Sequence, residues 1–196
     1  MRKLVYYVAT SLDGRIAGPD GQFDFYYSGD ERQAAAYSAW MTERYPETVP
    51  TAFREQVGVT DAEPRRFDTV LMGRGSYEPA LSQGVVSPYA HLRQYVVSRT
   101  LPKNPEAGIT LVREDPVGLV RELKREESDR DIWLCGGGKL AGVLMSEIDE
   151  LVIKSYPVLA GAGVPLVDGE FDPTVFTVTD RRTFDGGVVV SWLDRR

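Results

Sequence analysis

The stretch Ile132-Trp133-Leu134-Cys135-Gly136-Gly137-Gly138-Lys139-Leu140-Ala141-Gly142 decides the fold. Its apolar first part is typical of a buried strand, and the residues after the glycines follow a helix pattern. Consecutive glycines let a backbone approach a ligand closely and adopt positive φ. A helix that begins there offers free N–H groups and the positive end of its dipole, which together bind phosphate. The stretch therefore predicts a strand, a phosphate-binding turn and a helix, and a purely structural turn is the alternative.

This turn does not match either of two common nucleotide motifs in full. Leu140 stands where a Walker loop requires Ser or Thr after Lys139. Gly136, Gly138 and Ala141 satisfy the spacing G-x-G-x-x-A, but they lie late in the chain, whereas the usual dinucleotide fingerprint follows the first strand. The phosphate prediction thus depends on whether other parts of the chain support it.

Working outward, strand-like and helix-like segments alternate along the chain, which predicts an α/β fold of three layers (αβα) with a mainly parallel sheet. The expected strands are residues 3–10, 67–72, 94–98, 109–112, 131–135 and 150–156, and the expected helices are residues 30–45, 73–81, 116–128 and 138–147. Residues 174–182 and 188–193 flank Asp185-Gly186-Gly187, a pattern typical of an antiparallel hairpin at the C-terminal edge.

The remaining segments predict one domain, residues 1–196, with an insertion at about 24–66. Residues 12–29 are rich in glycine and are expected to form a loop, and a short helical stretch is expected at 51–56. No second apolar core is evident. A length of 196 residues also suits a single domain.

Composition excludes several classes of function. The net charge of −6 gives no basic excess for binding nucleic acid. One histidine and one cysteine argue against a zinc site, and we expect no metal. The chain contains no run of about 18 apolar residues, so no membrane span is predicted. Its start lacks a secretory signal pattern, and we therefore expect a cytoplasmic protein. We expect His91 in a surface stretch and Cys135 as a buried structural thiol.

Two further motifs resemble anion sites at the ends of strands. Gly73-Arg74-Gly75-Ser76 leads from a strand into a helix, where Ser76 could instead be a simple cap. Ser98-Arg99 ends another strand, in the zone where open α/β sheets bind ligands. Each could also be an ordinary strand end. Since all three motifs follow parallel strands, one dinucleotide with several phosphates could touch them all.

The segment from Ala9 to Gly18 ends the first strand and carries one acid, Asp13. A loop bounded by glycines can close over a cofactor and exclude water. Asp13 is our candidate catalytic residue, as a proton relay, although Asp13-Gly14 is also a common turn pair.

In this order the motifs resemble the dihydrofolate reductase superfold, and more closely the dihydrofolate-reductase-like proteins related to the reductase domain of the riboflavin-biosynthesis deaminase-reductase. The matching pieces are Ala9 to Ala17, Val70 to Glu78, Val97 to Leu101, Cys135 to Leu140 and Tyr156 to Leu166. The resemblance implies an NADPH-binding reductase of a small-molecule substrate, and a homodimer formed through the C-terminal strands. It places the nicotinamide between Ala9 and Thr10 on one side and Ile16 and Ala17 on the other. It places the phosphates at Gly73, Arg74, Gly75, Ser76, Ser98, Arg99, Gly136, Gly137, Gly138, Lys139 and Leu140.

One departure from dihydrofolate reductases bears on the substrate. Their Trp-x-x-Pro segment is replaced here by Phe23-Asp24-Phe25-Tyr26-Tyr27-Ser28, so folate is not the expected substrate. Aromatic residues of the 24–66 segment are instead expected to shape a pocket for a planar ring. The sequence thus predicts hydride transfer from NADPH to a C=N or C=O of a pterin-like or aminopyrimidine-like substrate. The alternative is a catalytically inactive nucleotide-binding protein of the same fold.

Overall fold

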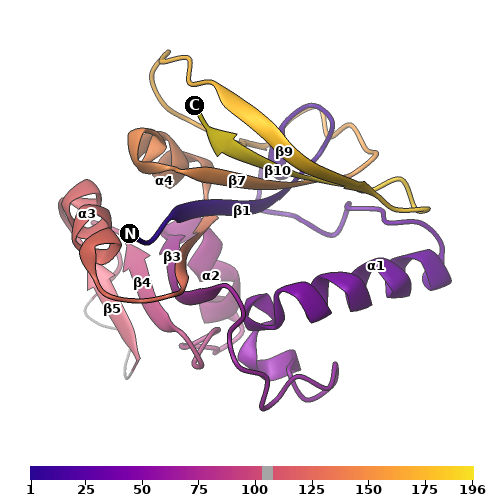
Figure 1. The fold of residues 1–196 in the computed structure, drawn as a ribbon, viewed down its shortest axis with the longest axis horizontal. Helices are drawn as coiled ribbons and strands as arrows, with labels where there is room; N and C mark the ends of the chain where they lie inside the picture. The colour runs from indigo at the N-terminus through magenta and orange to yellow at the C-terminus, as the bar shows by residue number, and fades with distance from the viewer. Residues whose placement is uncertain (103–107) are drawn as a thin grey trace.

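A computed structural model describes residues 1–102 and 108–196, and its centre is one twisted sheet of eight strands (Figure 1). The strands follow the order β5-β4-β3-β6-β1-β7-β10-β9. Their bounds are β1 Leu4–Thr10, β3 Phe67–Gly73, β4 Arg93–Val97, β5 Ile109–Val112, β6 Asp131–Gly136, β7 Glu150–Ser155, β9 Phe176–Thr183 and β10 Val189–Arg195. All pairings from β5 to β7 are parallel, whereas β10 pairs antiparallel with both β7 and β9. The mainly parallel sheet and its antiparallel C-terminal edge are confirmed.

Helices cover both faces of the sheet, which confirms the three layers. They are α1 (Glu31–Arg44), α2 (Arg74–Ser82), α3 (Pro116–Arg125) and α4 (Gly138–Val143). One core includes Tyr37 and Met41 of α1 and Tyr77 of α2, and the other includes Val120 of α3 and Leu140 of α4. Because successive strand residues point to opposite faces, the apolar run of β1 supplies both cores.

The helices begin in two different ways. Asp30 accepts a hydrogen bond from the backbone of Gln33 at the start of α1, and Asp115 accepts one from Gly118 at the start of α3. In contrast, α2 and α4 begin on Gly73 and Gly137, where no side chain forms a cap. Unlike α1 and α3, these two helices therefore keep first-turn N–H groups without a side-chain acceptor.

Several boundaries differ from those expected. The loop expected at 12–29 contains a short strand, β2 (Arg15–Ala17), which pairs antiparallel with β8 (Val164–Pro165). Strands this short carry no periodicity, and their pairing joins distant parts of the chain. The helix expected over 138–147 ends at Val143, just after Gly142, a poor helix former, and a 3-10 turn, η3, follows at Met145–Glu147. The helix expected over 116–128 ends at Arg125, and the stretch at 51–56 forms only the 3-10 turn η2, Thr51–Phe53.

The segment after α1 folds around a buried carboxylate. Glu47 lies in the 3-10 turn η1 (Pro46–Thr48), is fully buried, and accepts hydrogen bonds from the backbone N–H groups of residues 65–67 at 2.9–3.2 Å. Its own carbonyl oxygen lies 2.8 Å from Nε2 of His91. His91 is therefore half-buried rather than on the surface as expected, and burial lowers its pKa.

Candidate functional site

Four parallel strands end side by side and bring the predicted coenzyme residues to one edge of the sheet. In spatial order they are β4, β3, β6 and β1. They lead, respectively, to Ser98 and Arg99, to the turn at Gly73, to the turn at Gly136–Gly138, and to Ala9 and Thr10. Since neighbouring strands lie about 4.8 Å apart, the ends of β4 and β6 are about 10 Å apart. One dinucleotide can therefore reach all of these turns.

The two glycine turns touch each other. A Cβ added to Gly73 would lie 3.2 Å from the backbone N of Gly137, and one added to Gly136 would lie 3.4 Å from Oγ of Ser76 and 4.0 Å from Cδ1 of Ile16. Gly136 has φ of +126°, which requires glycine, and its peptide bond to Gly137 is cis. Two uncapped helix starts, Ser76 and Ile16 thus surround a stretch of bare backbone.

Basic side chains lie close to these turns. Arg74 is exposed, forms an ion pair with Glu78 at 2.5 Å and donates to Oγ1 of Thr100 at 2.8 Å, which links the start of α2 to the turn after β4. Arg99 and Lys139 are exposed, and in the described part of the chain their side chains form no hydrogen bond or ion pair. These two cations are available to an anionic ligand.

Other predicted phosphate contacts differ in how open they are. The side chain of Ser98 is buried, and its hydroxyl accepts from the N–H groups of Thr100 and Leu101 at 3.2 and 3.1 Å, which closes the turn after β4. Leu140 is buried in a core, so only its backbone could face a ligand. Gly75 is exposed in the first turn of α2.

Asp13 fastens two loops together. Its carboxylate accepts from the hydroxyl of Ser11 at 2.6 Å and from the N–H groups of Ala160 and Gly161 at 2.9 and 2.7 Å. These hydrogen bonds, that from Ser11 first, lower its pKa to about 2. At neutral pH the group therefore carries no proton to give. The loop after β1 is latched to the segment after β7, and the relay prediction gains no support from these contacts.

A second group of side chains near the carboxyl ends of the strands lies on the face of the sheet that α1 covers. Sequence analysis did not identify this group, which forms a wall of the site. Lys154 of β7 pairs with Ala9 of β1, and its Nζ lies 3.9 Å from the centre of the Tyr7 ring. Burial lowers the pKa of Lys154 to about 8 and raises that of Cys135, on β6, to about 12. The available signal was a lysine at an inward position of the apolar run Leu151-Val152-Ile153-Lys154.

Aromatic rings extend this wall. The rings of Tyr26 and Tyr156 lie 4.6 Å apart, and Tyr26 donates to the carbonyl oxygens of Ala9 and Arg15 at 3.2 and 3.0 Å. The hydroxyl of Tyr156 donates to that of Tyr37 on α1 at 3.0 Å. The expected aromatic lining from the 24–66 segment is thus present next to Ala9, although Phe23 and Tyr27 are largely exposed.

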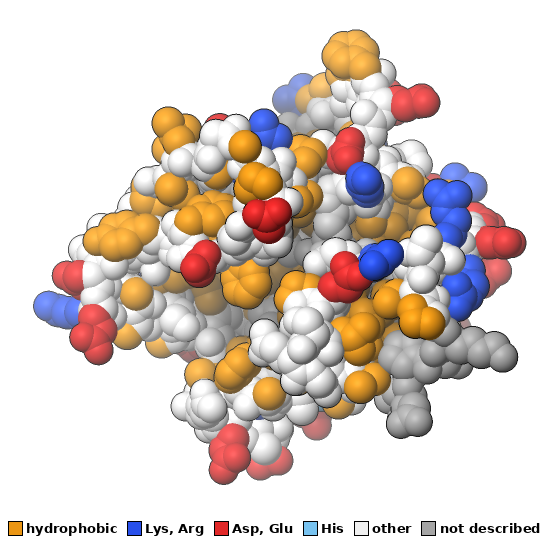
Figure 2. Space-filling view, turned by 180° about the vertical axis from the view of Figure 1, so that it is seen from behind, with side chains coloured by type: hydrophobic (Ala, Val, Ile, Leu, Met, Phe, Trp, Pro, Cys, Tyr) orange, Lys and Arg blue, Asp and Glu red, His pale blue; other side chains and the backbone are white. Residues whose placement is uncertain are grey.

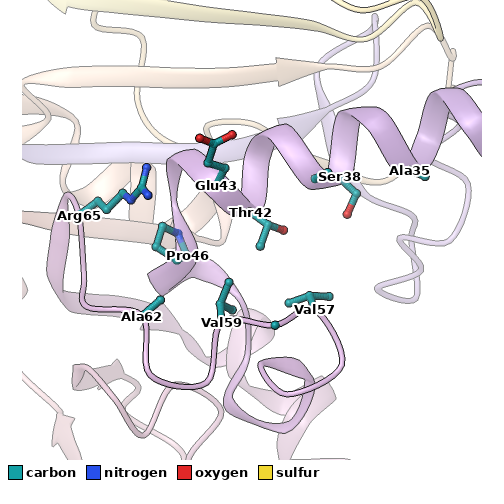
Figure 3. Close-up of a pocket in the computed structure, with 11 residues that line it drawn as sticks. Ala35, Ser38, Thr42, Glu43, Pro46, Val57, Val59, Ala62 and Arg65 are labelled. Atoms are coloured by element: carbon teal, nitrogen blue, oxygen red, sulfur yellow. The ribbon is translucent and has the colours of Figure 1, made fainter.

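A separate cavity of about 660 Å³ lies elsewhere. It is formed by the outer side of α1 and the loop around Val57–Ala62, with Ser38 and Thr42 among its lining residues (Figure 3). None of the predicted site residues lines it. Figure 2 shows the face opposite that of Figure 1, where hydrophobic side chains gather in a hollow near the centre.

Within the described ranges, no helix has the length and apolar character needed to cross a membrane, and no group of three His, Cys, Asp or Glu residues is placed to hold a metal.

The sheet order, the helices on both faces and the paired glycine turns define an α/β protein of the dihydrofolate-reductase-like class. The fold is similar to that of a dihydrofolate reductase from Enterococcus faecalis solved with NADP(H) and RAB-propyl (TM-score 0.61, 12% identity, 99% of this chain and 96% of that chain). It is also similar to a protein from Shewanella sp. PV-4 described as a putative riboflavin biosynthesis protein (TM-score 0.67, 25% identity, 100% and 99% covered).

The family follows from the sequence comparisons. Residues 2–190 match the model of the RibD C-terminal domain, and the chain belongs to this family. It is 31% identical over 194 residues to the uncharacterized protein YwjB of Bacillus subtilis (strain 168), covering 98% of each chain. It is 25% identical over 201 residues to the uncharacterized protein YyaP of the same strain, covering 96% of this chain and 92% of that one. The resemblance to the reductase domain of riboflavin biosynthesis is thereby confirmed, and it supports a function of the reductase type.

Proposed function

We propose that the protein is an NADPH-dependent reductase of a small, ring-containing substrate with a C=N or C=O group. The observation that carries the proposal is the meeting of two uncapped glycine-started helices at the carboxyl edge of the sheet. Free N–H groups and helix dipoles stabilise phosphate at such a place. The bare backbone at Gly136 and Gly137 leaves room for a pyrophosphate, so the residues present fit the coenzyme.

The choice of NADPH over NADH depends on the basic side chains beside the turn after β4. Arg99 is exposed and unpaired among the described residues, and Arg74 is held close by through Thr100. A guanidinium pairs well with a phosphate oxygen pair. We assign the 2′-phosphate to these two arginines, and the pyrophosphate to the backbone of Gly136–Gly138 with Lys139 at its rim.

Bound NADPH would supply a hydride beside Ala9 and Ile16. Hydride transfer needs a positioned acceptor carbon, a proton source and little water. The loop after β1 is held in place beside it, because Leu12 donates to the carbonyl of Val158 at 2.8 Å and Asp13 accepts from the N–H groups of Ala160 and Gly161. The chain's own part is therefore to bind, orient and exclude water.

Titration of NADPH and NADH by fluorescence, with the wild type and two variants, tests the proposal. We expect NADPH to bind more tightly than NADH in the wild type. Arg99→Ala should weaken NADPH binding about tenfold or more and leave NADH nearly unchanged, since a charge-assisted hydrogen bond contributes about 1.5–3 kcal/mol. Arg32→Ala, on the exposed side of α1, is the matched control and should behave as the wild type. If neither nucleotide binds at millimolar concentration, the proposal is rejected.

A further inference from the structure

Lys154 of β7, the strand next to β1, lies in surroundings that contain no acidic partner. Lys154 sits between Ala9 of β1 and Val190 of β10 in the register of the sheet, on the face that α1 covers. In the part of the chain that the structure describes, its Nζ forms no ion pair and no hydrogen bond. Half-buried lysines without a partner are costly, and they are commonly retained for function.

The groups that face Lys154 are aromatic or neutral. Its Nζ lies 3.9 Å from the centre of the Tyr7 ring, a favourable cation–π position. Cys135 approaches from β6, and Tyr156 lies just after β7, two residues beyond Lys154, where it donates to the hydroxyl of Tyr37 of α1. Burial raises the pKa of all four of these neighbours, so none of them exchanges a proton near neutral pH.

The charged groups on the same face are already engaged. Glu47, which lies close to Tyr7, has its carboxylate held by three backbone N–H groups. Arg182 of β9 pairs with Val190, and its guanidinium lies over the rings of Trp40 and Phe184. Arg44 of α1 likewise lies over the rings of Trp40 and Trp192. Among the cations that lie over rings of this wall in the described residues, Lys154 is the one whose strand position is paired with Ala9.

Resting on the proposed function, we propose that Lys154 is the catalytic proton donor, and that it acts on the oxygen or nitrogen of a C=O or C=N in a planar conjugated ring. Ala9, the register partner of Lys154, borders the expected hydride source, so acceptor carbon and proton source would be adjacent. The reduced nicotinamide gives a hydride to the carbon and is oxidised. The π electron pair of the C=O or C=N moves onto the oxygen or nitrogen and takes a proton from the Lys154 ammonium, so an N–H bond of Lys154 breaks and an O–H or N–H bond forms. Water then reprotonates the amine of Lys154.

Burial also lowers the pKa of Lys154 to about 8, close to the value at which a general acid works best in neutral solution. Asp13, with its pKa lowered to about 2, carries no proton at neutral pH. The neutral aromatic wall sets the substrate class as well, because flat rings stack on tyrosines. A ring that carries a partial negative charge on its carbonyl oxygen would gain most from the ammonium.

The first experiment measures Lys154 without any substrate. The chain has five lysines, so trace acetylation by acetic anhydride can be resolved site by site by mass spectrometry. We expect the labelling of Lys154 to reach half its maximum near pH 8, with Lys3 as the reference. Addition of NADPH together with isatin should protect Lys154 and leave Lys3 labelled. Labelling of Lys154 only near pH 10.5, or no protection, would overturn the inference.

The second experiment follows hydride transfer. Single-turnover oxidation of bound NADPH is measured with two planar probes, isatin for C=O and 6,7-dimethyl-7,8-dihydropterin for C=N. The wild-type rate should fall as pH rises through about 8, because the ammonium loses its proton. Lys154→Met should be slower by at least about 100-fold and independent of pH, since general acids contribute about 10²–10⁴. Lys154→Arg keeps the charge and should be equally slow, whereas Lys3→Met should match the wild type.

NADPH titration of Lys154→Met separates the two proposals. The variant should bind NADPH within about twofold of the wild type, which also shows that it folds. Absence of NADPH binding in the wild type would defeat the proposed function. NADPH binding without oxidation by either probe, or a Lys154→Met rate within threefold of the wild type, would refute the role of Lys154.

Discussion

Replacement of Lys154 by methionine should change how stability depends on pH. Folding carries the half-buried ammonium of Lys154 next to Tyr7, and burial lowers its pKa from 10.5 to about 8. The unfolded chain then binds more protons than the folded chain between these two values, so the free energy of unfolding of the wild type rises with pH there. Methionine fills a similar volume and does not titrate.

The difference in pKa corresponds to about 3 kcal/mol over the full range, of which about 2 kcal/mol falls between pH 7 and pH 9.5. These are upper values, because Lys154 keeps some exposure to solvent. Lys154→Met should therefore be more stable than the wild type at pH 7, and its advantage should shrink steadily toward pH 9.5. Urea unfolding of both proteins at four pH values in this range measures the effect. Parallel curves that differ by a constant within 0.5 kcal/mol would refute the reasoning, since they would show an ordinary lysine pKa.

Three other predictions test the packing around the site. Gly138→Ala should lower the free energy of unfolding, measured with urea, by about 1–3 kcal/mol, because the new Cβ would collide with the carbonyl oxygen of Pro165. Gly75→Ala, where a Cβ meets nothing within 4 Å, is the control and should change this free energy little. Asp13→Asn should speed amide hydrogen exchange in the segment after β7, and the contrast with the wild type should fade only as pH falls below about 4 toward 2, where Asp13 itself becomes protonated; equal exchange rates at pH 7 would contradict the latch. Glu47→Ala should lower the free energy of unfolding by about 3 kcal/mol, because three backbone donors lose their acceptor and the one at Phe67 is buried; a loss below 1 kcal/mol would show that water replaces the carboxylate.

The main elements could be predicted because their signals are local. The run Leu4–Thr10 is apolar throughout, as a strand buried on both faces must be, and Asp115-Pro116 marks a helix start. The glycines at 73 and 136–138 could be placed at one edge because parallel strands share their carboxyl ends. These features gave the fold class and the place where the coenzyme site is proposed.

Other features could not be predicted because they depend on distant partners. The strand Arg15–Ala17 exists through its pairing with Val164–Pro165, and Asp13 meets Ala160 only after both loops are placed. From the sequence, Lys154 is one lysine at the end of an apolar run. The neutral, partly buried surroundings of its ammonium become known only when the fold places Tyr7 and Cys135 beside it.

The edge that gathers the glycine turns is assembled from four pieces that are up to about 130 residues apart in the chain. The turns at Gly73 and Gly136 end neighbouring strands, β3 and β6, that are about 60 residues apart in the chain, and the end of β1 comes from the N-terminal segment. A nucleotide seated there would hold the middle of the molecule together and would add about 2.7 kcal/mol to its stability at a hundredfold excess over Kd. Melting temperature in the presence of coenzyme therefore serves as a gauge of whether these far-apart segments have all reached their places.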